Sequence, residues 1–365
     1  MKNIEIVSHF VDSPFIEIKG ESDSDYLIKV YDDRNSCIYE ETIKSNHWVR
    51  LNRSYYTNWR TEVYEDGNLI YNEPINLKNK RVYISFESKS LGDTLSWIPY
   101  VEEFRKKHGC KLIVSTFLNS LVEKQYPEIE FVSPKNTVHN LHALYRIGWF
   151  YKDGKYDSDK QPYDPKSQPL QKTASDILGL EFKEIRPNIK YPKLPKKKKI
   201  GIGIHGTAQA KYWNNPNGWQ DVVNHLNEKG YEVVIYSKEE DGYMNNTHPS
   251  GAKKFKEGPL NKLIYDMSSC EFFIGIGSGL SWLAWSIELP VILISGFSEK
   301  WTETDSNTFR VINDSVCHGC FNMCRLDASD WNWCPMLKGT DRMFECTKSI
   351  TSKMVIEQIE KIIEK

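Results

Sequence analysis

A chain of 365 residues is longer than a single hydrophobic core usually supports, so we expect two or three domains. Its 48 lysines and arginines nearly balance its 49 aspartates and glutamates, and this balance argues against a nucleic-acid partner. The first residues lack the apolar core of a signal peptide, and no stretch of 18 apolar residues follows. We therefore expect a soluble, cytoplasmic protein that does not insert into membranes.

Residues 1–78 alternate apolar and polar side chains in stretches such as Tyr26–Tyr31 and Trp59–Tyr64. Runs of Asp, Asn and Gly, at 32–35 and 66–68, separate these stretches as turns would. The pattern predicts a small all-β N-terminal domain over residues 1–78.

A different pattern begins near residue 80. A strand-like stretch at Arg81–Phe86, a helix-like stretch that ends at His108 and a second strand at Lys111–Ser115 have the order of a parallel α/β sheet. Residues 151–172, rich in Lys, Asp, Pro and Gln, look like a long surface loop. Residues 186–199 contain three prolines and end in four lysines, which places a domain boundary there. We expect a Rossmann-like domain over residues 79–195.

The remaining residues, 196–365, repeat the α/β alternation. Strands are predicted at 200–205, 231–236, 272–275 and 291–295, and helices over 219–229, from residue 260 and from residue 281. The fold class is therefore α/β, with two Rossmann-like domains after a small all-β domain.

The turn that follows the strand at Arg81–Phe86 contains Asp93, next to the start of the predicted helix. A carboxylate here could cap the helix by accepting backbone N–H bonds. It could also act as a general base, because ligands of open α/β sheets bind at this edge. Spacing alone leaves both roles open.

A second turn, Gly275-Ile-Gly-Ser-Gly-Leu-Ser281, lies between a strand and a helix. Its small residues would let backbone N–H groups approach a pyrophosphate at a helix N-terminus, with Gly277, Ser278, Gly279, Leu280 and Ser281 closest. The string differs from the GxGxxG fingerprint, so glycines that serve helix packing are the alternative.

The segment from His205 to Lys211 starts at the carboxyl end of the first strand of the last domain. Lys211 could therefore meet a phosphate held by the glycine turn, although a lone lysine is usually solvated. His205 is either a donor-site residue or a hydrogen-bonded structural histidine.

Five of the eight cysteines lie between residues 317 and 346. The CxxC pair Cys317 and Cys320, with Cys334 and Cys346, could close a tetrahedral thiolate site over residues 316–347, and Cys324 would be the spare. Four thiolates indicate a structural ion, zinc or iron; the alternative is a set of free, buried cysteines.

Taken together, these strings resemble the bacterial autotransporter heptosyltransferases, relatives of glycosyltransferase family nine. The resemblance runs from about residue 80 to 350 and rests on 90–104, 205–219, 277–282, 317–322, 330–335 and 344–346. It implies a GT-B fold, in which 79–195 faces the acceptor and 196–365 binds the nucleotide sugar, behind an N-terminal β-domain. It also implies an ADP-heptose donor, serine acceptors on an autotransporter protein and one iron ion in a four-cysteine finger.

Transferred to this chain, the family's motifs make Asp93 the base and place Lys211 on the donor diphosphate. Cys317, Cys320, Cys334 and Cys346 fall on the finger's ligand positions. We expect an inverting transfer that needs no catalytic divalent ion, carried out by a homo-oligomer. Two alternatives remain: a related enzyme that transfers another nucleotide-activated sugar to a glycan, and a non-catalytic sugar-binding scaffold.

Overall fold

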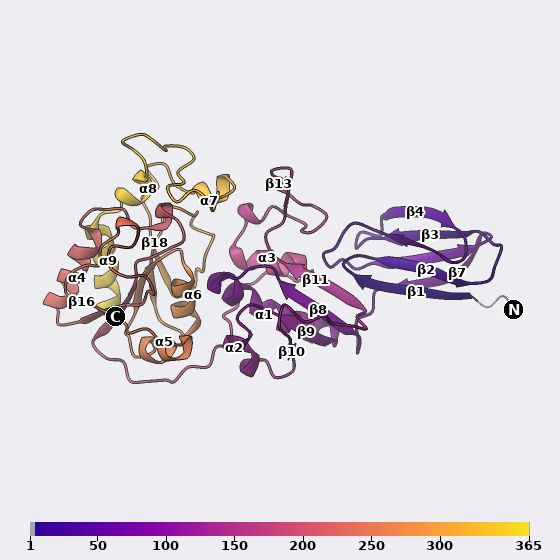
Figure 1. Cartoon of the computed structure of the whole chain (residues 1–365), viewed down its shortest axis with the longest axis horizontal. Helices are drawn as coiled ribbons and strands as arrows, with labels where there is room; N and C mark the ends of the chain where they lie inside the picture. Colours follow the sequence, from indigo (N-terminus) through magenta and orange to yellow (C-terminus); the bar gives the residue numbers. More distant parts are fainter. Residues whose placement is uncertain (1–3, 365) are drawn as a thin grey trace. The chain divides into compact units, whose positions relative to one another are not determined.

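A computed structural model describes residues 4–364 and divides the chain into two compact units (Figure 1). Unit 1 contains residues 1–89, 97–165 and 172–183; unit 2 contains residues 90–96, 166–171 and 184–365. The first turns of helix α1 (Leu91–His108), including Asp93, therefore belong with the C-terminal half of the chain.

Unit 1 is built on a seven-stranded sheet in the order β10-β9-β8-β11-β1-β2-β5. Its parallel part consists of β8 (Arg81–Phe86), β9 (Lys111–Ser115), β10 (Glu130–Phe131) and β11 (Ala143–Ile147). The N-terminal strands β1 (Ile4–Val11), β2 (Phe15–Gly20) and β5 (His47–Arg50) extend the same sheet. The junction is a short parallel pairing of β1 with β11, at Phe10 opposite Ala143 and Val11 opposite Leu144.

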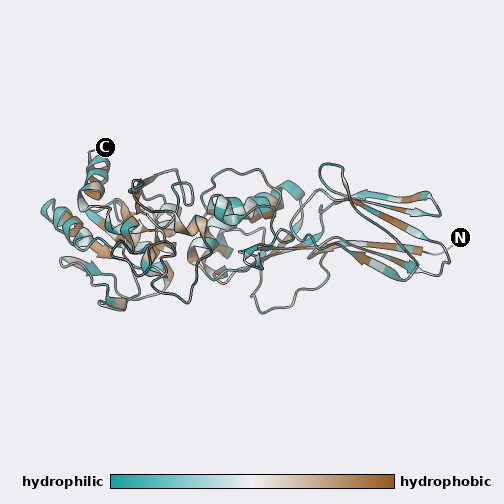
Figure 2. Cartoon of the chain, turned by 90° about the horizontal axis from the view of Figure 1, so that it is seen from above, coloured by the Kyte–Doolittle hydropathy of each residue, from teal (hydrophilic) through white to brown (hydrophobic). Residues whose placement is uncertain are grey.

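The other N-terminal strands form a four-stranded antiparallel sheet, β4-β3-β6-β7. They are β3 (Tyr26–Tyr31), β4 (Cys37–Ile43), β6 (Arg60–Glu65) and β7 (Asn68–Pro74). Along β3 every second residue is buried, so the alternation in the sequence did mark a strand with one face in the core. Figure 2 shows brown and teal stretches following one another along the strands near the N-terminus. The division of unit 1 at residue 78 stays a prediction.

The segment expected to be a long surface loop, residues 151–172, contains more structure than the sequence indicated. Strands β12 (Tyr151–Lys152) and β13 (Lys155–Tyr156) form a hairpin, and helix α3 (Leu170–Ile177) begins inside the segment. Unit 1 also contains two short helical turns, α2 (Asn119–Val122) and η1 (Glu123–Gln125). The chain passes from unit 1 to unit 2 within a third short turn, η2 (Pro165–Ser167).

Unit 2 contains a six-stranded parallel sheet in the order β16-β15-β14-β17-β18-β19. The strands are β14 (Lys199–Gly203), β15 (Glu232–Ile235), β16 (Ala252–Lys254), β17 (Phe273–Ile276), β18 (Val291–Ile294) and β19 (Thr308–Val311). The chain starts at β14, runs outward to β16 and then returns to the other side at β17. This reversal makes the carboxyl ends of β14 and β17 the topological switch point of the sheet, where ligands of such sheets bind.

Helices α4 (Gly218–Glu228), α5 (Leu260–Met267), α6 (Gly279–Ser286) and α9 (Ser352–Ile363) alternate with or follow these strands, as expected for a Rossmann-like unit. Helix α9, which the sequence analysis did not predict, packs against α4, β18 and β19. The segment that carries the cysteines is largely irregular, apart from the single turns α7 (Cys320–Met323) and α8 (Glu345–Lys348). Within residues 4–364, no helix is both long and apolar enough to span a bilayer.

Candidate functional site

Asp93 lies in the first turn of α1, where the preceding serine caps the helix. The Ser90 hydroxyl accepts a hydrogen bond from the backbone N–H of Asp93 at 3.4 Å, and the Ser90 carbonyl accepts one from the N–H of Thr94 at 3.1 Å. Ser90 therefore occupies the N-cap position, and Asp93 is the third helical residue, the acidic position of a capping box.

This first turn of α1 packs directly on the start of α6. A side chain at Gly279 would place its Cβ 2.9 Å from Leu91 Cβ and 3.2 Å from the Gly92 nitrogen. A side chain at Gly92 would come within 3.1 Å of the Trp282 ring. The two glycines are thus required for a close backbone contact that brings Asp93 to the glycine turn.

Within the glycine turn, Gly277 and Ser278 join β17 to α6. Ser281 donates a hydrogen bond to the Ile276 carbonyl at 2.7 Å and fixes the turn against its strand. The Ser278 hydroxyl is buried and has no hydrogen-bond partner within the described part of the chain. The first N–H groups of a helix carry positive potential, so this turn is suited to an anion.

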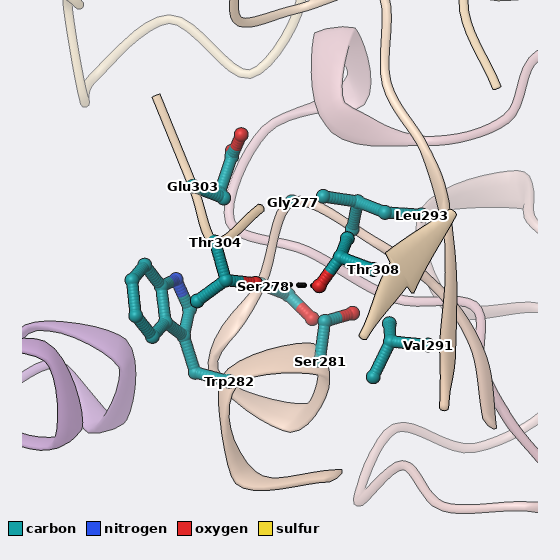
Figure 3. A pocket seen from close by; sticks show the side chains of 9 residues that line it. All are labelled: Gly277, Ser278, Ser281, Trp282, Val291, Leu293, Glu303, Thr304 and Thr308. Carbon is teal, nitrogen blue, oxygen red and sulfur yellow. Dashed lines mark hydrogen bonds between the residues drawn. The ribbon is translucent and has the colours of Figure 1, made fainter. Parts of the chain in front are cut away.

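Behind the turn is a small cavity with room for about one water molecule, drawn in Figure 3. Its lining is made of Gly277, Ser278, Ser281, Trp282, Val291, Leu293, Glu303, Thr304 and Thr308. Thr304 and Thr308 share a hydrogen bond of 2.7 Å, the dashed line in the figure. The space is too small for a sugar or a nucleotide.

Glu303, which lines this cavity, was not identified from the sequence. It accepts hydrogen bonds from Ser298 at 2.8 and 3.1 Å and pairs with Arg310 at 2.9 Å, and the side chains of the ion pair are only 12 % and 11 % exposed. A Cβ on Gly277 would meet Glu303 Oε1 at 2.9 Å. A buried ion pair of this kind fixes local geometry more than it adds stability.

Lys211 ends a short turn, η3 (Gln209–Lys211), beyond the carboxyl end of β14. Its ammonium donates to the Thr207 hydroxyl at 3.1 Å and lies 5.4 Å from the centre of the Phe297 ring. Desolvation by the surrounding protein lowers the pKa of the Lys211 ammonium, whereas the negative charges of Asp93 and Glu303 act to raise it. Lys211 and the acids Asp93 and Glu303 therefore lie close enough within unit 2 to interact electrostatically.

His205 directly follows β14 and is 5 % exposed. Burial lowers its pKa to about 4, so the imidazole is neutral at physiological pH. Neither of its ring nitrogens has a hydrogen-bond partner in the structure as described. The expectation of a hydrogen-bonded structural histidine is therefore wrong, and a place in the donor site stays a prediction. Leu280, in the first turn of α6, has its Cβ 3.6 Å from the position that a Cβ on Gly203 would take.

Four of the five clustered cysteines approach one another. Burial raises the pKa values of Cys320 and Cys346 to about 12, and each thiol also interacts electrostatically with Cys317 and Cys334. Cys320 and Cys334 are buried in one apolar cluster with Phe297, Trp333 and Phe344. The four thiols are therefore chemically suited to bind a thiophilic metal ion. Within residues 4–364, however, no three His, Cys, Asp or Glu side chains have the arrangement of a metal site.

The cysteine-rich segment also contacts the donor-side loops. The N–H of Gln209 donates to the Trp331 carbonyl at 3.0 Å, and that of Gly319 donates to the Gly296 carbonyl at 2.9 Å. A Cβ on Gly296 would clash with the Cys346 carbonyl oxygen, so no side chain fits there. This segment therefore supports the loops that carry Lys211 and Phe297.

Comparison with known proteins assigns the family. Residues 135–323 match glycosyltransferase family 9 (heptosyltransferase). The chain is 36% identical over 350 residues to the autotransporter heptosyltransferase Aah of Escherichia coli, covering 92% of this chain and 88% of Aah. It belongs to the autotransporter heptosyltransferases.

The match extends to the three-dimensional structure. The iron-containing dodecameric glycosyltransferase TibC of enterotoxigenic E. coli superposes with a TM-score of 0.88 at 33% identity, over 99% of this chain and 96% of TibC. TibC has also been solved with ADP-D-beta-D-heptose, with the same TM-score at 32% identity, over 98% of this chain and 96% of that chain. This chain therefore has the α/β glycosyltransferase fold of TibC.

A further relative of this heptosyltransferase differs in activity. BimC of Burkholderia thailandensis, described as an inactive autotransporter heptosyltransferase, is 28% identical over 326 residues, covering 86% of this chain and 75% of BimC. Membership of the autotransporter heptosyltransferases thus leaves catalysis to be argued from the site.

Proposed function

We propose that this autotransporter heptosyltransferase moves a heptose from ADP-heptose to a serine hydroxyl of an autotransporter protein, with inversion at the anomeric carbon. The observation that carries the proposal is that, within unit 2, the first turn of α1 with Asp93 packs on the glycine turn, and Lys211 lies beside Gly206 close to the end of β17, next to the switch point between β14 and β17. Support for the donor comes from TibC and its ADP-heptose complex.

The departing diphosphate is the negative charge that the site must stabilise. Lys211 would donate to its oxygens, and the first N–H groups of α6 at Gly279 to Ser281 would face it. Donors that are already in place before the reaction stabilise developing charge without reorganisation, and this stabilisation often contributes most to the rate enhancement of an enzyme. Glu303 would keep the turn in position through Ser298 and Arg310.

Asp93 would take the proton of the acceptor. As the serine oxygen forms its bond to the anomeric carbon, the bond from that carbon to the diphosphate oxygen breaks and ADP leaves. The serine proton passes to the Asp93 carboxylate. A base that acts on an acceptor hydroxyl must lie beside the donor, and the contact of α1 with Gly279 and Trp282 supports this placement.

For the architecture we propose the two-domain GT-B fold, with residues 79–195 as the acceptor-side domain and 196–365 holding the donor, preceded in the sequence by the small β-domain. We also propose that Cys317, Cys320, Cys334 and Cys346 hold one structural iron ion per chain. Iron-containing TibC and the shared electrostatics of the four thiols support this ligand set. Zinc is the alternative, because both metals accept tetrahedral thiolate sites.

We further propose that the chain works in the cytoplasm, where nucleotide-activated sugars are made, and as a homo-oligomer, in line with dodecameric TibC.

The test of function is transfer by the purified chain. ADP-heptose, ADP-glucose and UDP-glucose are each incubated with an autotransporter passenger, and the intact mass of the passenger is measured. We expect a heptose adduct with ADP-heptose alone and none with Asp93→Asn, which keeps the shape of the carboxylate. A passenger that never gains mass would place this chain beside the inactive relative BimC, and a gain from UDP-glucose would favour another sugar.

A further inference from the structure

Gln209 ties the turn that carries Lys211 to the cysteine-rich segment. Its backbone N–H donates to the Trp331 carbonyl at 3.0 Å, and its side-chain oxygen accepts a hydrogen bond from the indole N–H of Trp331 at 3.2 Å. Its side-chain nitrogen donates to Asn214 at 2.7 Å and to Asn246 at 3.1 Å, and the Asn246 amide donates to the Gln209 side-chain oxygen at 3.0 Å. Both donors and both acceptor positions of the Gln209 amide are therefore used.

Asn214 extends this link to a second point of the cysteine-rich segment. Its amide nitrogen donates to the Gln209 carbonyl at 3.0 Å and to the Thr347 hydroxyl at 2.8 Å. The last two clustered cysteines lie between Trp331 and Thr347 in the sequence. Gln209 is thus connected, directly or through one amide, to both ends of the stretch that contains these cysteines.

The other two residues of η3 contact the same part of unit 2. Ala210 is 5 % exposed and packs in one apolar cluster with Phe297 and Cys320. The Lys211 ammonium lies 5.4 Å from the centre of the Phe297 ring. A single 3-10 turn of three residues is too short to be stable by itself, so η3 keeps its shape through these tertiary contacts.

The place of Lys211 decides how well its ammonium meets a phosphate. Charge-assisted hydrogen bonds are short and directional, and a lysine side chain loses many rotamers when it is fixed. A residue that is held in place before the ligand binds reduces this cost. The hydrogen bond from Lys211 to Thr207 at 3.1 Å aligns the side chain, whereas the contacts of Gln209 and Ala210 fix the backbone of the turn.

We propose that Gln209 is a positioning residue for the donor lysine, because it anchors the turn of Lys211 on the cysteine-rich segment. This inference rests on the proposed function of Lys211, and Gln209 acts through that lysine rather than by contact with the donor. The strength with which the chain holds the donor diphosphate then depends on the fold of a segment outside the sheet. Any change that loosens this segment weakens donor binding.

Calorimetry with ADP and inorganic pyrophosphate tests whether Gln209 acts through Lys211. Gln209→Leu removes the four hydrogen bonds of the amide and keeps a side chain of similar size. We expect it to bind both probes about ten-fold more weakly than the parent. In a Lys211→Ala background, which has already lost the phosphate contact, Gln209→Leu should cause no further loss, because effects that pass through one residue are not additive.

Trp331→Phe tests the same link from the cysteine-rich segment, since it removes the indole N–H and keeps an aromatic ring. It should weaken both probes, by less than Gln209→Leu, and should have no effect in the Lys211→Ala background. Thermal melting shows whether each variant is folded. If Gln209→Leu is not folded, Trp331→Phe with and without Lys211→Ala decides in the same way.

Gln220→Leu is the matched control. The Gln220 amide on α4 donates to Asn224 at 2.8 Å and to the Ser250 carbonyl at 3.0 Å, and accepts from the Ser250 N–H at 2.8 Å. It likewise joins two segments, but these partners belong neither to η3 nor to the cysteine-rich segment, so Gln220→Leu should bind both probes like the parent.

Three results would overturn the inference. If Lys211→Ala weakens both probes but Gln209→Leu and Trp331→Phe bind them like the parent, the anchoring role is wrong and the proposed function stands. If Gln209→Leu causes an equal loss in the Lys211→Ala background, Gln209 shapes the site independently of Lys211 and the inference is again wrong. A parent chain that binds neither probe overturns the function and the inference together.

Discussion

Replacing Gly279 by alanine tests whether the contact between the starts of α1 and α6 sets the position of the base. The new Cβ would lie 2.9 Å from Leu91 Cβ and 3.2 Å from the Gly92 nitrogen, and neither atom belongs to a flexible side-chain end. Carbon atoms prefer separations of about 3.5–4.0 Å, so the first turn of α1 must move by roughly 0.6–1 Å. Overpacking of this size costs about 1–3 kcal/mol, partly offset by the roughly 1 kcal/mol that alanine gains over glycine in a helix.

Because Asp93 is two residues from Leu91, the same movement displaces the proposed base. A misplacement of about 1 Å can cost about 100-fold in rate. We expect kcat for heptose transfer to fall about 100-fold in Gly279→Ala, with a modest loss in Tm and less than a ten-fold change in ADP affinity. The control is Gly258→Ala, whose Cβ would meet the flexible Lys262 side chain at 3.4 Å. Unchanged turnover in Gly279→Ala would refute the reasoning.

Three further predictions concern the donor cation, the cysteines and acid stability. Lys211→Ala should weaken ADP binding about 10- to 100-fold by calorimetry, because a charge-assisted hydrogen bond is lost. In the parent, the affinity for ADP should fall as pH rises through the lowered pKa of Lys211. If the ADP affinity of Lys211→Ala depended equally on pH, this role of Lys211 would be contradicted. Cys334→Ser should lose iron and stability whereas Cys324→Ser keeps both, measured by elemental analysis and thermal melting, and iron retained in Cys334→Ser would exclude that ligand. Burial lowers the pKa values of His205 and His108 to about 4, below the ordinary 6.5. Between these pH values the unfolded chain binds more protons than the folded chain, so the free energy of unfolding should fall as pH drops from 6.5 toward 4. Denaturant titrations should show a smaller loss of stability in His205→Phe, and an equal loss would count against a buried neutral His205.

The sequence was most informative where a pattern is local. The strands at Arg81–Phe86 and Lys111–Ser115 were predicted to the residue, and the helix of α4 to within one residue at each end. Hydrophobic periodicity and turn residues determine such elements within a short window. The parallel pairing of β1 with β11 joins segments more than a hundred residues apart, and no local pattern contains that information.

The site shows the same limit. The spacing could not decide whether Asp93 caps its helix, because the helix start was uncertain by a few residues; the structure makes Ser90 the N-cap. Glu303 and Arg310 carry no motif, and their importance comes from meeting behind Gly277. The unpartnered nitrogens of His205 are likewise visible only once β15 and the cysteine-rich segment are folded around it.

The central claim is that this chain transfers heptose to protein through Asp93, and one measurement tests it most directly. The parent and Asp93→Asn are incubated with ADP-heptose and an autotransporter passenger, and the intact mass of the passenger is followed beside the ADP affinity of each enzyme. We predict that the parent adds whole heptosyl units to the passenger. Asp93→Asn should bind ADP with the parent's affinity and add none. An Asp93→Asn enzyme that glycosylates at the parent's rate would contradict the account.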